Sequence, residues 1–227
     1  MSDTKLSGMR VLITQSRDFM GPALCDVFAA AGAEVLADES SPVLPEAAGQ
    51  MIAAAGRIDA LILNLALPAP STRAEQVGDD EWRAVFRVMV DPMQQLVRAV
   101  LPQMIERQAG KIVLMGSASA LRGMAGRSSY AAARGAQLAY IQALGVEVAG
   151  QGIRANAIAQ NFVDNPTYFP PEVQARPEFK DRLRWQVPLG RLVTPVEDAS
   201  FAAYLCSEAA NCFVGQIFPM CGGWVPR

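Results

Sequence analysis

KIVLMGSASALRGMAGRSSYAAAR, residues 111–134, is the stretch of sequence that decides the fold. It opens with an apolar run of strand length, Lys111–Met115, and continues through a loop of small and polar residues. A segment with helical spacing, Tyr130–Ala149, follows that loop. A buried strand that leads through a loop into a helix is the repeating unit of α/β domains with a parallel sheet.

The same unit recurs along the 227 residues of the chain. Other short apolar runs predict strands at Arg10–Thr14, Ala33–Leu36, Ala60–Leu63, Ile153–Ile158 and Ile217–Met220. Helical spacing predicts helices at Gly21–Ala31, Ala47–Ala54, Glu81–Ile105 and Val196–Ser207. We therefore expect a Rossmann-like, doubly wound parallel sheet with helices on both faces, in a single domain of residues 1–227. The stretch from Ala37 to Asp59 has room for one helix and a vestigial strand around Pro42–Leu44, so a sheet trimmed at that point is expected.

Composition excludes several classes of function. The formal net charge is −2 and the basic residues are scattered, so no nucleic-acid partner is expected. The chain has no histidine, which rules out Ser-His-Asp and Cys-His catalytic units. The four cysteines form no Cys-x-x-Cys pair and predict buried free thiols rather than a metal site. No apolar run approaches about 18 residues and no signal sequence is visible, so we expect a cytoplasmic protein without membrane association.

Three polar residues in the quoted stretch form a candidate catalytic set. Ser117 follows the strand directly, and Tyr130 and Arg134 lie one helical turn apart on the same face of the following helix. Ligands of α/β sheets bind beyond the carboxyl ends of the strands, where this loop lies. A fixed cation stabilises a phenolate, so Arg134 is expected to draw the pKa of Tyr130 down and to make it a general base. Arg134 itself is expected to stay charged under ordinary conditions, so its role would be electrostatic and positional rather than proton transfer.

This region resembles the short-chain dehydrogenase/reductase family, whose signature is a strand-end serine followed by Tyr-x-x-x-Lys, with arginine here in place of lysine. The family's first strand ends in Thr-Gly-x-x-x-Gly-x-Gly, which lets the backbone approach a dinucleotide. Here the loop reads Thr14-Gln15-Ser16-Arg17-Asp18-Phe19-Met20-Gly21. We expect the side chains of Gln15 and Phe19 to fill the space of the phosphates and nicotinamide ribose, and so expect no cofactor. Asp38 and Glu39 stand at about the spacing of a ribose-binding acid, but solvated strand-end carboxylates are expected.

The aromatic-containing first loop together with Ser-x12-Tyr-x-x-x-Arg resembles the haloalcohol dehalogenases, most closely their B-type branch. That resemblance implies that Tyr130 deprotonates the hydroxyl of a vicinal haloalcohol, Ser117 binds its oxygen, and Arg134 lowers the tyrosine pKa. The alkoxide then displaces the halide, giving an epoxide, and the reverse reaction opens epoxides with anions. The resemblance also implies a homotetramer with four-helix contacts. The expected halide-binding residues are Phe19, Gln160, Asn161, Phe162 and Val163.

The surroundings of this site and its exact function are less fully determined by the sequence. Asn161–Arg176, rich in Pro and aromatics, is expected to form an irregular active-site lid that extends over residues 160–185. Phe169, Trp185 and Trp224 are candidates for the substrate pocket, although large aromatics are more often core residues. Some relatives carry an acidic residue after the asparagine that follows the strand Ala60–Leu63. Here Asn64 is followed by Leu65, so a proton relay at that point is not expected. Two other functions remain open: an NAD(P)-dependent oxidoreductase with an irregular nucleotide loop, and a non-catalytic ligand-binding relative.

Overall fold

The computed structural model describes residues 5–40 and 44–225. Its centre is a parallel sheet with the strand order β2-β1-β3-β4-β5-β6. The strands are β1 (Arg10–Ile13), β2 (Glu34–Ala37), β3 (Ala60–Leu63), β4 (Gly110–Ser117), β5 (Ile153–Gln160) and β6 (Ile217–Met220). All five neighbouring pairs are parallel, which confirms the predicted Rossmann-like class.

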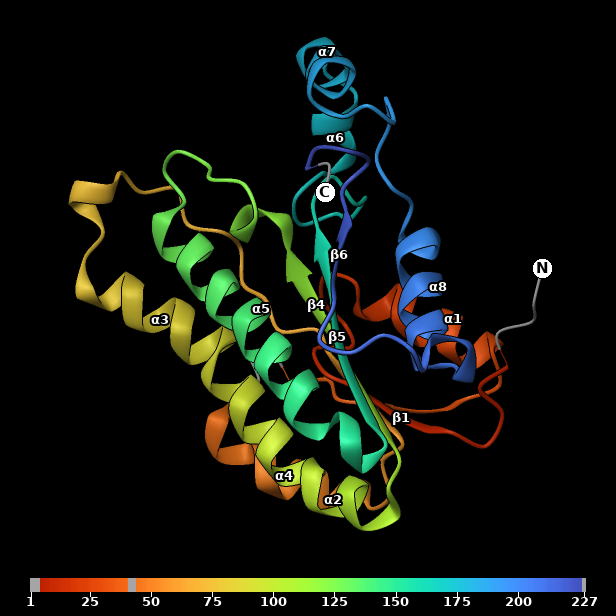
Figure 1. Ribbon diagram of the computed structural model, residues 1–227. Helices are drawn as coiled ribbons and strands as arrows, with labels where there is room; N and C mark the ends of the chain where they lie inside the picture. The colour runs from red at the N-terminus through yellow and green to blue at the C-terminus, as the bar shows by residue number, and fades with distance from the viewer. Residues whose placement is uncertain (1–4, 41–43, 226–227) are drawn as a thin grey trace.

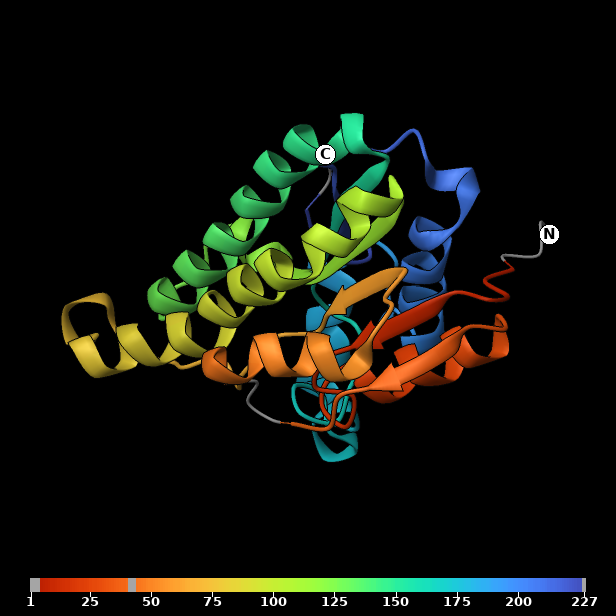
Figure 2. The ribbon, with the colours of Figure 1, turned by 90° about the horizontal axis from the view of Figure 1, so that it is seen from below.

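Helices cover both faces of this sheet, as the alternating pattern predicted (Figures 1 and 2). One layer contains α2 (Ala48–Ala55), α4 (Asp91–Arg107) and α5 (Ser128–Val148), and the opposite layer contains α1 (Gly21–Ala30) and α8 (Pro195–Cys206). Each layer has its own buried apolar cluster, because alternate strand residues point to opposite faces. Leu114 packs in the first cluster and Val113 in the second. The chain forms one α/β domain.

The long helix predicted at Glu81–Ile105 is two helices. α3 covers Asp79–Met89, and α4 begins at Asp91 with Pro92 in its first turn. Proline lacks an N–H, so it fits the first turn of a new helix, where no intrahelical acceptor is needed. The break at Val90 therefore has a local cause.

The trimmed side of the sheet lies beside β2. Among the described residues β2 is the edge strand on this side and β6 on the other, and Leu44 belongs to no strand. Pro42 and Val43, the remainder of the predicted vestigial strand, lie outside the described residues. Short 3-10 turns complete the fold at Pro45–Ala47, Ala74–Gln76, Ala118–Ala120, Ala149–Gln151 and Glu208–Ala210.

The carboxyl ends of the strands point toward two short helices, α6 (Pro171–Gln174) and α7 (Pro177–Gln186), at the top of Figure 1. No helix was predicted in Asn161–Arg176, and this was wrong, because α6 lies within that segment. Each helix begins with a proline in its first turn, so the prolines that suggested a loop also start helices. No helix in the described part of the chain is long and apolar enough to cross a membrane.

Candidate active site

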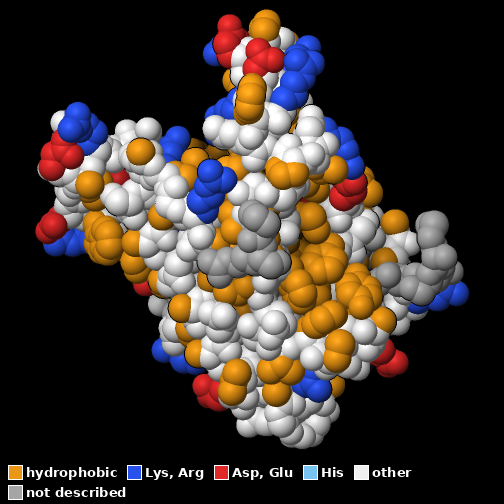
Figure 3. All heavy atoms as spheres, turned by 45° about the horizontal axis from the view of Figure 1, so that its top comes forward, with side chains coloured by type: hydrophobic (Ala, Val, Ile, Leu, Met, Phe, Trp, Pro, Cys, Tyr) orange, Lys and Arg blue, Asp and Glu red, His pale blue; other side chains and the backbone are white. Residues whose placement is uncertain are grey.

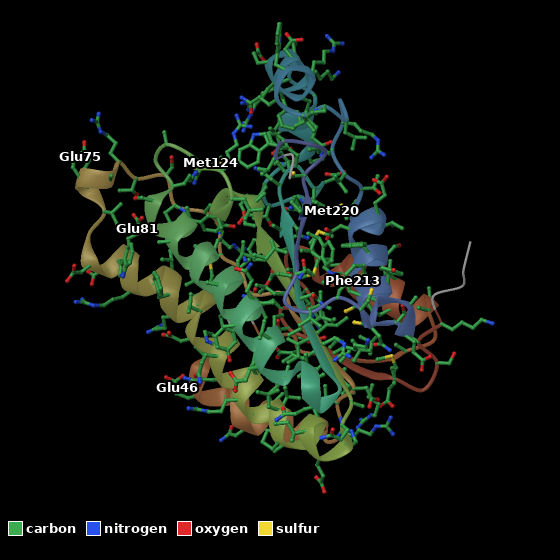
Figure 4. The ribbon with its side chains drawn as sticks, in the orientation of Figure 1. Glu46, Glu75, Glu81, Met124, Phe213 and Met220 are labelled. Carbon is green, nitrogen blue, oxygen red and sulfur yellow. The ribbon has the colours of Figure 1, made fainter. Side chains whose placement is uncertain are left out.

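A cavity of about 220 Å³ lies beyond the carboxyl ends of the strands. Its lining comes from the strand ends and loops after β1, β3, β4 and β5, from α5 and from α7, the arrangement expected of a ligand site in such a sheet. All three predicted catalytic residues line it, and so do all five predicted halide-binding residues. Other lining residues include Met20, Asn64, Ala66, Met115, Met124, Arg127, Asn165, Tyr168, Phe169 and Arg182. Figure 4 shows Met124 on the loop before α5, on the side of the α6–α7 segment.

Tyr130 and Arg134 meet on one face of α5. The Arg134 Nε atom donates to the Tyr130 hydroxyl at 3.0 Å, and the guanidinium carbon lies 5.1 Å from the centre of the tyrosine ring. Both side chains are buried, with 6% of Tyr130 and 3% of Arg134 exposed. The i, i+4 spacing read from the sequence therefore places the cation directly against the phenol oxygen.

The Arg134 guanidinium is held by neutral acceptors. Its Nη1 atom donates to the carbonyls of Leu65 and Met115 and to the Gln137 side chain, at 3.1, 3.2 and 2.9 Å. Gln137 is itself fixed by a 2.6 Å bond to the Met89 carbonyl. None of these acceptors is a carboxylate, so the positive charge is hydrogen-bonded but not neutralised. A phenolate on Tyr130 would supply the missing negative charge.

The pKa of Tyr130 follows from two opposing effects. Burial raises it, because the charged form is desolvated. The Arg134 charge lowers it, and interactions with the hydroxyls of Tyr168 and Ser117 and with the Arg134 side chain add to this. The lowering effects prevail, and the pKa of Tyr130 falls below its ordinary value. Such a tyrosine can act as a general base.

Ser117 ends β4 and faces the same cavity. Its Oγ atom lies 2.9 Å from the Ser119 hydroxyl and accepts the backbone N–H of Ser119 at 3.2 Å. These contacts fix the rotamer of Ser117, and only 9% of the residue is exposed. A hydroxyl fixed in this way can bind a ligand oxygen without first being ordered.

Tyr168 is a site residue that the sequence reasoning missed. It comes from the loop before α6, yet its hydroxyl donates to the Leu67 carbonyl at 2.9 Å and lies 3.4 Å from the Tyr130 hydroxyl. Burial raises the pKa of Tyr168, and the nearby Tyr130 raises it further, so Tyr168 stays a neutral donor. Its position depends on a contact between residues 38 apart in the chain, which no local pattern shows.

The start of α5 is anchored against α3. Glu81 accepts hydrogen bonds from Ser129 at 2.5 Å and from Thr72 at 2.6 Å, and both bonds lower the pKa of the Glu81 carboxyl. Figure 4 shows Glu81 beside the first turn of α5. Arg127 also holds the loop after β3 by donating to the Ala69 and Pro70 carbonyls. These contacts fix the turn of helix that carries Tyr130.

The loop after β1 is closed by its own side chains. The Gln15 amide donates to the Ala66 carbonyl at 3.2 Å and accepts from the Ala66 N–H at 2.8 Å. Asn64 donates to the carbonyls of Gln15 and Asp18, each at 3.0 Å. Phe19 is half-buried and packs its ring 5.8 Å from that of Tyr168. Hydrogen bonds within the chain therefore satisfy polar groups of this loop, and the Phe19 ring fills space between the loop and Tyr168.

Gln15 and Phe19 have φ angles of +46° and +51°, the left-handed region that favours glycine. A non-glycine residue there costs roughly 1–2 kcal/mol. At Gly21 an added Cβ would lie 2.4 Å from the carbonyl oxygens of Gln15 and Ser16, so the loop folds tightly onto the start of α1. The residues present do not fit a dinucleotide, because side chains stand where glycines would leave room for its phosphates.

The two carboxylates at the end of β2 have partners of their own. Asp38 accepts the Ser40 hydroxyl at 2.7 Å, and Glu39 pairs with Arg17 at 2.6 Å. Glu39 is exposed and Asp38 is half-buried. This agrees with the expected surface carboxylates.

The predicted halide-binding segment surrounds one side of the cavity. Gln160 ends β5, Phe162 has a φ of +53°, and Val163 forms a bridge with Val193. The Asn161 side chain accepts the backbone N–H of Phe162 at 2.9 Å. An anion at this point would therefore compete with the Asn161 oxygen for that donor.

The three aromatic candidates for the substrate pocket have different positions. Phe169 lines the cavity, whereas Trp224 is a core residue that packs edge-on against Phe162, with ring centres 6.0 Å apart. Trp185 is 89% exposed on the outer face of α7, so its candidacy was wrong. Phe179 and Leu183 bury the inner face of that helix at i, i+4 spacing, which turns Trp185 outward.

Cysteines and acids offer no obvious metal site in the described part of the chain. No group of three or more His, Cys, Asp or Glu residues is placed to hold an ion there. All four cysteines are free thiols; Cys206 and Cys221 are buried, Cys25 is half-buried and Cys212 is exposed, so the prediction of four buried thiols was only half right.

Comparison with known proteins gives the wider context. Residues 7–225 match the family described as Enoyl-(Acyl carrier protein) reductase. Galactitol 2-dehydrogenase (L-tagatose-forming) of Cereibacter sphaeroides is 33% identical, over 97% of this chain and 96% of that protein. A 3-oxoacyl-(acyl-carrier-protein) reductase of Thermotoga maritima is 27% identical, over 97% of this chain and 99% of that protein. A solved structure described as "Dehalogenation enzyme" matches with a TM-score of 0.90 and 32% identity, covering 97% of this chain and 99% of that one.

Proposed function

The chain belongs to the short-chain dehydrogenase/reductase superfamily, and within this enzyme family we propose that it is a cofactor-independent haloalcohol dehalogenase. The observation that carries the proposal is the buried Arg134 guanidinium, which has neutral acceptors and contacts the Tyr130 hydroxyl at 3.0 Å. The loop filled by Gln15 and Phe19 and the likeness to a dehalogenation enzyme support it. A tyrosine base beside a loop whose glycine positions carry the side chains of Gln15 and Phe19 suits a reaction with no change of oxidation state.

The reaction would convert a vicinal haloalcohol to an epoxide. The Tyr130 phenolate takes the proton of the substrate hydroxyl, whose oxygen is hydrogen-bonded by Ser117. The oxygen then forms a bond to the neighbouring carbon as the carbon–halogen bond breaks, and the halide leaves with the bonding pair. The proton on Tyr130 passes to water to restore the phenolate. Run backwards, the same steps open an epoxide with an anionic nucleophile.

The cavity suits an anionic leaving group. Arg127, Arg134 and Arg182 are among its lining residues, while none of the described lining residues is Asp or Glu. Negative charge that develops on the departing halide is stabilised by such a site. We assign the halide to the side formed by Phe19 and residues 160–163, and the haloalcohol carbon chain to the space near Phe169 and Met124.

The test is chloride release from 1,3-dichloro-2-propanol by nucleotide-free protein at mildly alkaline pH, with epoxide measured in parallel. The matched control is Tyr140→Phe, which removes a phenol hydroxyl from the same helix but outside the cavity. Release of both products by the parent and by Tyr140→Phe, and its loss in Tyr130→Phe, is expected. No release from several chloro- and bromoalcohols would contradict the proposal.

A second candidate function is an NAD(P)-dependent oxidoreductase. It is favoured by the names of the sequence relatives, which are dehydrogenases and reductases. A fluorescence titration with NADH and NADPH distinguishes the two. Saturable binding would favour the oxidoreductase, and its absence together with chloride release would favour the dehalogenase.

We also propose a homotetramer. α4 and α5 form a groove lined by Leu101, Ile105, Tyr140 and Leu144, where two such helix pairs could form a four-helix contact. A second apolar face lies over β6 and α8, where Phe201, Tyr204, Phe213 and Phe218 pack together (Figure 3). Sedimentation equilibrium at several concentrations would give the mass; a monomer throughout would contradict this assembly.

A further inference from the structure

Asp198 is a buried carboxyl behind the cavity that the proposed mechanism does not use. It lies in the first turn of α8 and has no exposed surface. One oxygen, Oδ2, accepts a hydrogen bond from the Gln160 Nε2 atom. The other, Oδ1, is buried and has no hydrogen-bond partner among the described residues. A buried polar atom without a partner is costly, so this arrangement needs a physical reason.

Gln160 connects this carboxyl to the cavity. It is the last residue of β5, in register with Ser117 of β4 on one side and Met220 of β6 on the other. Figure 4 shows Met220 between the upper end of the sheet and α8. Gln160 is half-buried and lines the cavity, with one end of its amide bound to Asp198. The side chain therefore spans from α8 to the proposed leaving-group side.

We propose that Asp198 is a positioning residue that selects which end of the Gln160 amide faces the cavity, and that its ionisation thereby controls how tightly the site holds a halide. As a neutral acid it donates to the Gln160 oxygen and turns the NH₂ group toward the cavity. As a carboxylate it accepts from the NH₂ group, as in the structure, and turns the oxygen toward the cavity. This inference rests on the proposed dehalogenase function.

The chemistry of the amide makes such a switch possible. A glutamine side chain has donors at one end and an acceptor at the other, and its last torsion is close to two-fold, so a half-turn exchanges them at little cost. A halide accepts hydrogen bonds and is repelled by an oxygen lone pair. Hydrogen bonds to charged groups are among the stronger ones in proteins. The orientation of one amide therefore has a large effect on anion affinity.

Both ionisation states of Asp198 are accessible near neutral pH. Burial raises the pKa of Asp198 to about 7, and the Gln160 hydrogen bond offsets part of this effect. No charge on a neighbouring element contributes to that shift. The charged and titratable groups on α8 and on the elements around it are Glu197, Tyr204, Cys206, Cys25, Asp26, Lys111, Arg154, Asp164 and Glu208. Lys111 and Arg154 lie at the opposite ends of β4 and β5 from the cavity, and Glu197 pairs with Arg191.

The test measures halide binding without catalysis. In a Tyr130→Phe background, which removes the tyrosine's own titration, bromide and chloride binding are followed by halide NMR line broadening between pH 5 and 9 at constant ionic strength. We expect affinity to fall about tenfold with a midpoint near 7. Asp198→Asn should keep the acidic-side affinity at every pH, because its amide still donates to the Gln160 oxygen. Gln160→Leu should bind weakly at every pH.

The matched control is Asp164→Asn, which removes a carboxyl that bonds Gln174 rather than Gln160. This variant should keep the fall in halide affinity near pH 7. If Asp198→Asn or Gln160→Leu kept that fall in halide affinity, the inference would be overturned. The dehalogenase proposal would still stand, provided that the parent releases chloride from haloalcohols. No halide binding at any pH, together with no such release, would overturn both. If Asp198→Asn fails to fold, as judged by circular dichroism, Gln160→Leu alone decides the outcome in the same way.

Discussion

The Nε atom of Arg134 and the hydroxyl of Tyr130 are 3.0 Å apart, and both lie in a buried part of α5. The remaining hydrogen bonds of Arg134 go to two carbonyls and an amide. This geometry couples the ionisation of the tyrosine to one fixed cation. The coupling leads to predictions that can be tested one side chain at a time.

Replacing Arg134 with lysine should raise the pKa of Tyr130, because a lysine cannot bond the phenol and the three other acceptors in the same geometry. We expect chloride release at pH 7 to fall about tenfold or more and to recover partly above pH 9. A pH–rate profile for Arg134→Lys measures the shift of its acidic limb. Arg83→Lys, an exposed change on α3, is the control, and an unshifted profile in Arg134→Lys would count against the assigned role.

Removing the Tyr168 hydroxyl should also raise the pKa of Tyr130, because Tyr168 can then no longer turn its single proton from the Leu67 carbonyl to the Tyr130 phenolate. The expected cost is one hydrogen bond of about 1 kcal/mol, or roughly a three- to tenfold lower rate on the acidic limb. Tyr168→Phe is compared with Tyr204→Phe, whose hydroxyl lies 3.5 Å from the Ala209 carbonyl. Identical pH–rate profiles for Tyr168→Phe and the parent would show that Tyr168 only packs.

Asp198 should make stability depend on pH. The pKa of this carboxyl is raised from 3.8 to about 7 in the folded protein, so the folded state holds the proton more tightly than the unfolded chain. Its stabilising contribution is complete below the unfolded value and is lost as pH rises through 7. One pKa unit corresponds to about 1.4 kcal/mol, which gives a loss of roughly 4 kcal/mol across that range. Asp198→Asn should flatten this part of the pH dependence.

The measurement for that prediction is urea unfolding of the parent and of Asp198→Asn at intervals from pH 4 to 8. Asp26→Asn, an exposed acid on α1, is the control. Parallel curves for the parent and Asp198→Asn would mean that the carboxyl does not titrate in this window.

Gln15→Ala should destabilise the protein by about 2 kcal/mol. The change removes both hydrogen bonds to Ala66, whose backbone groups are buried, and keeps a non-glycine residue at positive φ. Thermal unfolding compares it with Arg17→Ala, an exposed change in the same loop. Equal melting temperatures for the two variants would show that the Gln15 bridge contributes little.

Much of the fold was predictable because its signals are local. Strand-length apolar runs and helical spacing gave the order of the elements, and Lys111–Met115 lies within the observed β4. The split between α3 and α4 also had a local sign, the Asp91-Pro92 pair, which the longer apolar pattern concealed. The outward position of Trp185 follows from the spacing of Phe179 and Leu183 once α7 is recognised as a helix.

The candidate site was predictable only where spacing determined geometry. Tyr130 and Arg134 meet because i, i+4 residues of a helix are neighbours, and Ser117 joins them because it ends the adjoining strand. Tyr168 and Asp198 reach the site through contacts over 38 residues, to Tyr130 and Gln160 respectively. Such contacts depend on how the loop before α6 and α8 itself pack against the rest of the fold, which the local pattern does not contain.

The loop after β1 keeps a glycine-like backbone at two positions that carry larger side chains, since Gln15 and Phe19 both have positive φ. Its chain path and its side chains can therefore change independently. A loop with glycine at both positions would differ from this one by substitution alone, without insertion or rebuilding of the turn. The two substitutions can be made in the laboratory. Glycine at positions 15 and 19 would relieve the backbone strain of the positive φ angles and would also remove the side chains from the loop. The backbone contribution to the free energy of folding would therefore favour a variant designed to bind a nucleotide cofactor.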